Sequence, residues 1–558
     1  MNRKKFYLLL FLIIILCLYF IISSVISISA DEIVFSADSG FYDNEFDLVL
    51  EASDGIIYYT LDGSEPTCDS VRYEAPIHIY DASANENVYC MRTDISPVFY
   101  SDVMEQYNTE QAPIYSIPDY RIDKCTVVRA VVYYGDDNYS DIYTKTYFVG
   151  YENKPGYSGI MTASIVTDPY YLFDYNDGIY VTGRAFDDFV ADTIGTDACW
   201  CTDSFTLWTA NYTKGIAKEV PCSFILMDEN GAVVLSQNCA MKIHGGGSRS
   251  YNPKSLNLYA GWEYGEESFN YDFFGNGYIP GEITFSQGGD DYNAKIRDCL
   301  ACTLAADMDV CTMHYRPCVM FLDGEYWGVY FITEKYNEEY LEYYYGVDSS
   351  NIIMIKNDTL EIGDVGDEVQ WQQMKEFCTN SDMADPENYA RACELVDIDS
   401  YIDYYALMIM VDRSGDWPGG NTAAWRSRKA ASGEYNDCRW RWMVYDLNSS
   451  SMWHKSFDED NLARTMEIDA MFANFMQNQD FKNAFLDRLS GISEEDFSQE
   501  RVDAFIDEYE QQMCDALEND RKRFFGENTI ANYGNIEYVR DFFELRREYI
   551  SDLILRYR

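Results

Sequence analysis

The chain has few histidines and few basic residues for its length. Its 558 residues include 4 His, and Lys plus Arg number 42 against 94 Asp plus Glu, which gives a formal charge of −52. The four histidines are scattered along the sequence, so a zinc hydrolase built on clustered imidazoles lacks its ligands. An excess of acidic groups repels phosphates, which argues against nucleic acid as a partner. We therefore expect any metal chemistry to use oxygen ligands and protein partners to be basic.

A long apolar run occurs at the N-terminus. The basic residues 2–5 precede an apolar run from Phe6 to Ile22, which extends weakly to Ile28. Such a segment can span a bilayer, and the positive charge before it directs the following chain out of the cytoplasm. We expect residues 1–30 to be a signal anchor in the cell membrane. A signal peptide cleaved after Ala30 is the close alternative, and it would make the protein secreted.

Residues 31–150 alternate apolar and polar positions in short runs separated by turn signals. This pattern predicts a β-sandwich. The segment YYTLDGSEPT (58–67) resembles the immunoglobulin-like domain appended to chitobiases and hexosaminidases, which implies a spacer or accessory module. Its tyrosines either bind sugar, which would make cell-wall polysaccharide a partner, or pack on strand faces, which we favour.

The rest of the chain predicts an α+β fold of two lobes. Residues 151–159 form a linker rich in Gly and Pro. Residues 160–336 contain strand-like runs, including one at 178–183, a helix at 293–308 and a hairpin turn at Asp323-Gly324. From 337 to 558 helical spacing dominates. A strand-rich half followed by a helix-rich half is typical of α+β proteins.

The sharpest chemical pattern is DWPGGN, from Asp416 to Asn421. A carboxylate followed five positions later by a carboxamide has the spacing of a kinase catalytic loop, where the first accepts a hydroxyl proton and the second holds magnesium. The strand RWRWMVYD then ends in Asp446, a carboxylate placed to bind a metal ion that bridges phosphates. For each of these residues taken alone, the alternative interpretation is a solvated surface group, since acidic residues are abundant here.

A glycine-rich turn lies upstream in HGGGSRSYNPKSLNLY (244–259). Gly246 permits close backbone approach, and Ser248 and Arg249 supply hydrogen-bond donors, as a turn that covers phosphates requires. A run of glycines is weak evidence by itself.

Lys254 follows this turn and shares strand parity with apolar neighbours, so we expect its side chain to point inward. A lysine aimed inward needs an anionic partner. Nucleotide phosphate is one candidate and Asp298, on the expected helix, is another. The alternative places the ammonium in water at the sheet edge.

Five blocks occur in one order along the chain. They are GGGSRSYNPKSLNLY, FSQGGDDYNAKIRDCLACTLAADM (285–308), YRPCVMFLDGEYWGVYFITEKYNEEYL (315–341), GDWPGGNTAAWR (415–426) and WMVYDLNSS (442–450). In this order they resemble the spore coat protein H (CotH) kinase family. The resemblance covers about Ile160 to the C-terminus and implies an atypical protein-kinase-like fold that transfers phosphate from ATP, with Mg²⁺ or Mn²⁺, to serines of a secreted or coat protein.

The resemblance also implies residue roles. Asp416 becomes the catalytic acid/base, Asn421 and Asp446 the metal ligands, and Lys254 the phosphate-binding lysine. Glu334, within 333–336, falls in the hinge that carries adenine. One departure is Asn448, where many members carry a second Asp.

Three functions remain open at this point. The first is a membrane-anchored, outward-facing kinase for a Ser-rich, basic protein. The second is a catalytically inactive surface protein that binds carbohydrate or mediates adhesion on a kinase-like fold. The third, a glycoside hydrolase, has carboxylates but no motif. The intact acidic motif favours the kinase.

Overall fold

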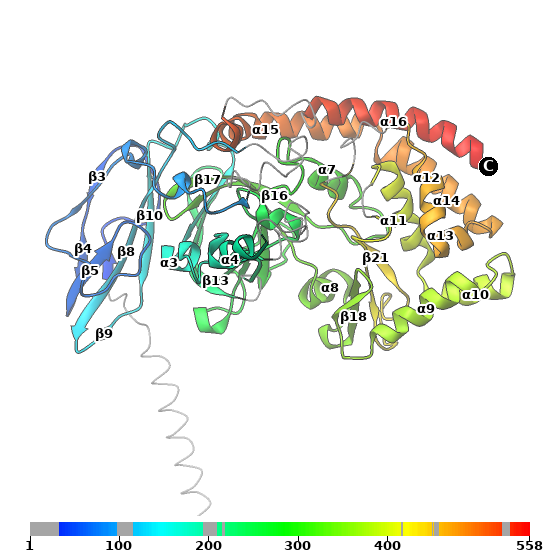
Figure 1. Ribbon diagram of the computed structural model, residues 1–558, viewed down its shortest axis with the longest axis horizontal. Coiled ribbons are helices and arrows are strands. Elements are labelled where there is room, and N and C mark those ends of the chain that lie inside the picture. The colour runs from blue at the N-terminus through cyan, green and yellow to red at the C-terminus, as the bar shows by residue number, and fades with distance from the viewer. Residues whose placement is uncertain are drawn as a thin grey trace, which may run out of the picture.

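The fold proceeds from a β-sandwich through a closed barrel to a helical region (Figure 1). This computed structural model describes residues 33–97, 115–193, 209–214, 218–413, 417–448, 450, 457–526 and 536–558. Both the expected anchor, residues 1–30, and the expected catalytic Asp416 lie outside these ranges. No helix within the described ranges is both long and apolar enough to cross a membrane.

The N-terminal sandwich consists of short antiparallel strands, apart from the parallel β2–β10 pair. They are β1 (Ile33–Phe35), β2 (Gly40–Tyr42), β3 (Phe46–Leu48), β4 (Leu50–Ala52), β5 (Ile56–Thr60), β6 (Val71–Arg72), β7 (Ile77–Ile79), β8 (Thr126–Gly135), β9 (Asn138–Tyr139) and β10 (Tyr143–Val149). Its main sheet has the order β2-β10-β8-β5-β6. Tyr58 and Tyr133 pack edge to face with ring centroids 6.1 Å apart, so these tyrosines contact each other across strands.

Seven strands then close into a barrel in the order β11-β12-β13-β14-β15-β17-β16. Closure removes the exposed sheet edges that an open sheet would leave. The strands are β11 (Met161–Val166), β12 (Val220–Met227), β13 (Val233–Ile243), β14 (Leu256–Tyr259), β15 (Glu282–Ser286), β16 (Tyr315–Leu322) and β17 (Glu325–Thr333). The helices beside them are α3 (Pro169–Phe173), α4 (Gly183–Thr193), α6 (Asn211–Lys214) and α7 (Arg297–Leu304).

Two expectations for this region need correction and one is confirmed. Residues 178–182 form a buried irregular stretch instead of a strand, and α4 begins at Gly183. The helix expected at 293–308 is shorter, because Lys295 has φ 51° and the Asp291 carboxylate accepts the amide protons at the start of α7. The β16–β17 hairpin turns at Asp323-Gly324, both with positive φ, as expected.

The C-terminal region is helical around a four-stranded sheet of order β19-β18-β20-β21. Its strands are β18 (Ile352–Lys356), β19 (Thr359–Ile362), β20 (Ala423–Ser427) and β21 (Arg441–Met443). Its helices are α8 (Glu338–Tyr345), α9 (Glu368–Asn380), α10 (Pro386–Leu395), α11 (Ile398–Met410), α12 (Asn461–Ile468), α13 (Ala470–Phe475), α14 (Gln479–Gly491), α15 (Gln499–Phe525) and α16 (Ile536–Tyr557). Helix α11 is buried from Ser400 onward, which agrees with its apolar sequence.

Helix α15 returns to the barrel and fastens it to the helical region (Figure 1). Asp520 accepts a hydrogen bond of 2.7 Å from the Val329 amide and pairs with the Lys295 ammonium at 3.2 Å. Both charged side chains are 1% exposed, so each neutralises the charge of the other. This contact joins α15, β17 and the segment that leads into α7.

The sandwich docks firmly on the barrel. The Glu325 carboxylate at the start of β17 accepts hydrogen bonds of 2.6 Å and 2.7 Å from the amides of Val88 and Cys90. Gly63 of the LDGSEPT motif lies so close to the β16–β17 turn that a Cβ there would be 2.8 Å from an Asp323 oxygen. The motif that the sequence assigns to a spacer therefore packs on the barrel.

We expect Glu325→Ala to lower the free energy of unfolding by about 2 kcal/mol, because the buried Cys90 amide and the partly buried Val88 amide lose their acceptor. Urea unfolding of the full chain measures this change. The exposed Glu361→Ala on β19 is the control and should be nearly neutral. Equal stabilities of the two variants would contradict the docking role of Glu325.

Candidate active site

Two carboxylates from distant parts of the chain meet between the barrel and the helical region. Asp298 lies in the first turn of α7, and Asp446 follows β21. The Asp298 Oδ1 accepts a 2.5 Å hydrogen bond from the Leu447 amide. The Asn448 side-chain amide donates to Asp446 Oδ1 at 2.9 Å and to Asp298 Oδ2 at 3.4 Å. One carboxamide thus bridges both acids.

Asn421 and Arg413 complete the surroundings of Asp446. The Asn421 amide donates to Asp446 Oδ2, and the Arg413 guanidinium lies 3.6 Å from the same oxygen. Arg413 is buried, whereas the Asp446 side chain is 38% exposed. Asn421 and Asp446 have φ of 50° and 60°, the left-handed region that non-glycine residues seldom adopt. Such strained conformations cluster at functional sites.

The electrostatics of this cluster favour a cation. Burial, together with the negative charge of Asp446, raises the pKa of the Asp298 carboxyl to about 7. Two acids that repel each other, with only amide groups between them, bind a divalent ion well because the ion removes the repulsion.

A glycine pair lets a second loop approach Asn448. The Asp290 amide donates to the Asn448 side-chain oxygen at 3.2 Å, and the Tyr251 hydroxyl donates to Asp290 at 2.7 Å. Gly289 has φ 56°, and a Cβ there would lie 2.6 Å from the Asn448 amide nitrogen. The GGDD segment (288–291) therefore belongs to the site, and the tight Gly-Gly spacing is the sequence signal for it.

Lys254 has a different environment from the expected one. Its ammonium donates to the backbone carbonyls of Ile95 (2.7 Å), Arg249 and Tyr251 (3.1 Å), and it lies 4.2 Å from the centre of the Tyr212 ring. The side chain is 0% exposed, and burial lowers its pKa well below the usual value. Lys254 points inward as expected, but carbonyls and aromatic rings surround it instead of Asp298 or an open phosphate site.

The glycine-rich turn supports this lysine. Residues 247–250 form a 3-10 turn, and the Arg249 carbonyl in it accepts from Lys254. A Cβ at Gly246 would meet no atom within 4 Å, so close approach does not demand glycine there. At Gly245, by contrast, φ is 110° and a Cβ would lie 2.5 Å from the Ser248 hydroxyl oxygen. Among the described residues, Tyr251 links this turn to the acidic cluster through its hydrogen bond to Asp290.

Lys295 is a lysine that the sequence analysis missed. It lines a small cavity of about 10 Å³ together with Asp298 and Asn448. Its ammonium donates to the Val329 carbonyl at 2.9 Å and pairs with Asp520. A helix was expected over this position, so the positive φ that turns Lys295 toward the cavity was not foreseen.

Glu334 directly follows β17, and several hydrogen bonds hold its carboxylate. It accepts hydrogen bonds from the His314 amide at 2.8 Å, from the His314 ring at 3.0 Å and from the Tyr344 hydroxyl. The side chain is buried and raises the pKa of the His314 imidazole through its hydrogen bond. This carboxylate therefore fixes the junction between the barrel and α8.

The cluster can hold a hard divalent cation. Its carboxylate oxygens come from Asp298 and Asp446. Asn421 and Asn448 turn their side-chain nitrogens toward Asp446, so their carboxamides would have to rotate to add oxygen ligands. Oxygen donors suit Mg²⁺ and Mn²⁺. Across the described ranges no three His, Cys, Asp or Glu side chains gather as a metal site, so the amides or Asp416 would have to complete the ligand set.

An acidic cluster between a β-rich region and a helical region resembles the sites at which kinases hold the metal ion for phosphotransfer. The family model described as CotH kinase protein matches residues 241–550, more than half of the chain, and the chain belongs to this family. Membership makes it a kinase-type transferase at the family level. A second model, described as Fn3 associated, matches residues 48–147, within the sandwich. No curated protein matches the chain.

The Asp298 pKa predicts a pH-dependent stability. The folded state holds this carboxyl's proton up to about pH 7, whereas the unfolded state releases it near pH 3.8, so ionisation destabilises the metal-free protein as pH rises between these values. Asp298→Asn cannot ionise. We expect it to exceed the wild type in free energy of unfolding by at least about 1 kcal/mol above pH 7, and by progressively less toward pH 4.

Urea unfolding at pH 4.5 and at pH 8, with a chelator present, measures this difference. Asp541→Asn, on the exposed face of α16, is the control and should show the same small effect at both pH values. A difference between Asp298→Asn and the wild type that does not grow with pH would contradict the raised pKa.

Proposed function

We propose that the chain is an extracytoplasmic protein kinase that transfers the γ-phosphoryl group of ATP, with Mg²⁺ or Mn²⁺, to serine hydroxyls of a secreted, surface or coat protein. The observation that carries this proposal is the Asp298–Asn448–Asp446–Asn421 cluster. Its acids and amides come from three of the five ordered blocks, 285–308, 415–426 and 442–450. The cluster also offers oxygen ligands of the kind that nucleotide kinases use for their metal.

Each residue of the cluster has a defined task in this proposal. Asp446 and Asn421 would hold the metal ion, and Asp298 would supply a second carboxylate to it. The bound metal would neutralise charge on the transferred phosphoryl group. Arg413 and Asn448 orient the carboxylates through their contacts with Asp446.

Asp416 accepts the serine proton as the phosphorus–oxygen bond forms. Its place five residues before Asn421 supports this role, because the loop then presents base and metal ligand together. Lys295, and not Lys254, is the lysine beside this cluster, since it lines the same small cavity as Asp298.

The proposal also covers the cellular location of the chain and the kind of protein that it phosphorylates. The basic residues and apolar run of the N-terminus favour a membrane anchor with the remaining chain outside the cytoplasm. A net charge of −52 favours a cationic, Ser-rich protein as substrate, because opposite charges speed and orient the encounter.

Transfer from labelled ATP to a Ser/Lys-rich peptide tests the activity. We expect Asp416→Ala and Asp446→Ala each to lower transfer by roughly 100-fold or more, because each removes a group that acts on the reacting atoms. Thermal melting should show that Asp446→Ala stays folded, because relief of its repulsion with Asp298 offsets part of the lost contact with the buried Arg413.

Equal label with all three proteins would overturn the kinase proposal and leave the inactive, carbohydrate-binding alternative. Loss of both label and thermal stability in Asp446→Ala would instead assign that residue a structural role.

A further inference from the structure

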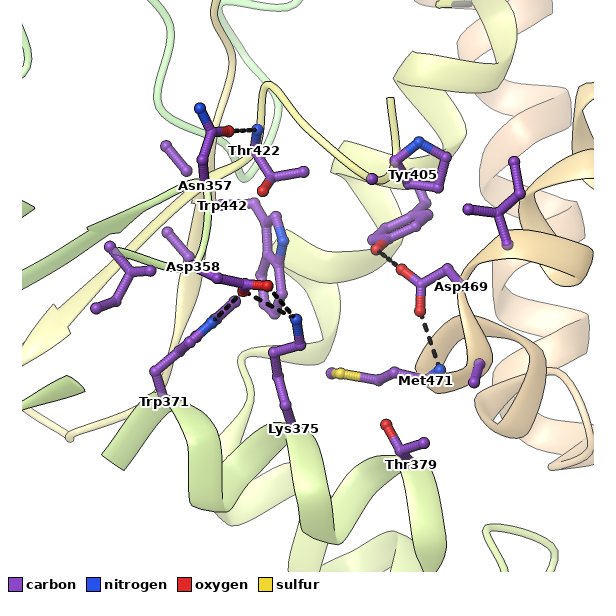
Figure 2. A pocket seen from close by; sticks show the side chains of 17 residues that line it. Asn357, Asp358, Trp371, Lys375, Thr379, Tyr405, Thr422, Trp442, Asp469 and Met471 are labelled. Atoms are coloured by element: carbon purple, nitrogen blue, oxygen red, sulfur yellow. Dashed lines mark hydrogen bonds and ion pairs between the residues drawn. The ribbon is translucent and has the colours of Figure 1, made fainter. Parts of the chain in front are cut away.

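A pocket of about 270 Å³ lies in the helical region beside the loop that carries Asn421 (Figure 2). Its walls come from the β18–β19 turn, α9, α11, the 418–424 segment, β21 and the junction of α12 and α13. This volume is below the roughly 300–1,000 Å³ typical of sites for drug-sized ligands, and it suits one long side chain.

Aromatic rings make up much of the lining. Trp371, Trp442 and Tyr405 line the pocket, and the two indole centroids are 6.1 Å apart at an interplanar angle of 53°. All three side chains are otherwise buried, which fixes the orientation of their rings. Rigid aromatic faces bind alkyl chains and attract cations.

The charges around the pocket are net negative. Asp358 and Asp469 both line it, while Lys375 is the basic residue in the lining. Lys375 pairs with Asp358 at 2.8 Å, and Figure 2 shows this pair facing Asp469 and Tyr405 across the pocket. Asp469 accepts hydrogen bonds from uncharged donors: the Tyr405 hydroxyl and the amides of Met471 and Phe472. Its negative charge thus has no balancing cation in the lining.

The pocket and the acidic cluster share one loop. Pro418, Gly419 and Thr422 line the pocket, and Asn421 between them contacts Asp446. The Asn357 side chain holds this loop by accepting from the Thr422 amide at 3.1 Å. A polypeptide that presents a serine to the loop therefore passes within a side chain's reach of the pocket.

We infer that this pocket is a specificity site that takes a Lys or Arg side chain of the substrate polypeptide, close to the serine that is phosphorylated. The assignment rests on the proposed kinase function for its biological meaning. The alkyl stem packs against Trp371 and Trp442, and the cationic group reaches Asp469. A norleucine side chain would gain the aromatic contacts without the charge.

Peptides that differ in one flanking residue test the inference on the full chain. A neutral serine peptide carries either Lys or norleucine at each position near the serine, and kcat/KM is measured for each. We expect the wild type to prefer Lys by about tenfold at one or two positions. Asp469→Asn should reduce this preference to about twofold or less, because it removes the charge but keeps an N-cap acceptor for α13.

Two further variants separate the charge effect from damage to the fold. Asp385 caps α10 through the amides of Glu387 and Asn388, as Asp469 caps α13, but it lies outside the pocket lining. Asp385→Asn should keep the tenfold preference. Lys375→Gln leaves Asp358 without its ion pair, so the preference for Lys should rise by about threefold or more.

Each outcome decides one question. No Lys preference in the wild type, or an unchanged preference in Asp469→Asn and Lys375→Gln, overturns the pocket assignment and leaves the kinase proposal intact. If no peptide is phosphorylated, the kinase proposal fails and fluorescence anisotropy of the labelled peptides decides the pocket. Tighter binding of the Lys peptide that Asp469→Asn weakens supports the pocket, and equal binding of both peptides overturns it.

Discussion

The repulsion between Asp298 and Asp446 is the constraint on which the site depends. Burial and the neighbouring charge raise the pKa of Asp298, and the fold tolerates this because the Leu447 amide and the Asn448 side chain donate to the carboxylates. The amides and the Arg413 guanidinium, 3.6 Å from Asp446, compensate only part of the charge. A divalent cation would compensate it fully, so the two carboxylates together favour binding of a metal ion. The rest of the molecule must hold them at this separation.

The remainder of the fold supplies that support. Asp298 sits on α7 and Asp446 follows β21, so the distance between the acids depends on how the barrel meets the helical region. The buried Lys295–Asp520 pair fixes that junction from one side, since removing either partner would leave an uncompensated charge. Docking of the sandwich through Glu325 braces the same β17 strand at its other end.

Local sequence patterns predicted much of the fold and part of the site. The alternation of apolar and polar residues predicted most strands, and the expected Asp323-Gly324 turn is present. The spacing from Asp416 to Asn421 and Asp446 pointed to the loop and the strand end that carry part of the acidic cluster. Parity placed Lys254 inward but could not supply its partners, which are backbone carbonyls from Ile95, Arg249 and Tyr251. Lys295 was missed because helical spacing cannot show its positive φ or its pairing with Asp520 of α15.

Anomalous diffraction from crystals of the full chain grown with Mn²⁺ and a non-hydrolysable ATP analogue tests the central claim most directly. The account predicts a manganese peak within coordination distance, about 2.0–2.6 Å, of an Asp446 oxygen and beside Asn421 and Asp298, with phosphate oxygens completing the shell. A nucleotide bound elsewhere, or manganese that does not contact Asp446, would contradict the account.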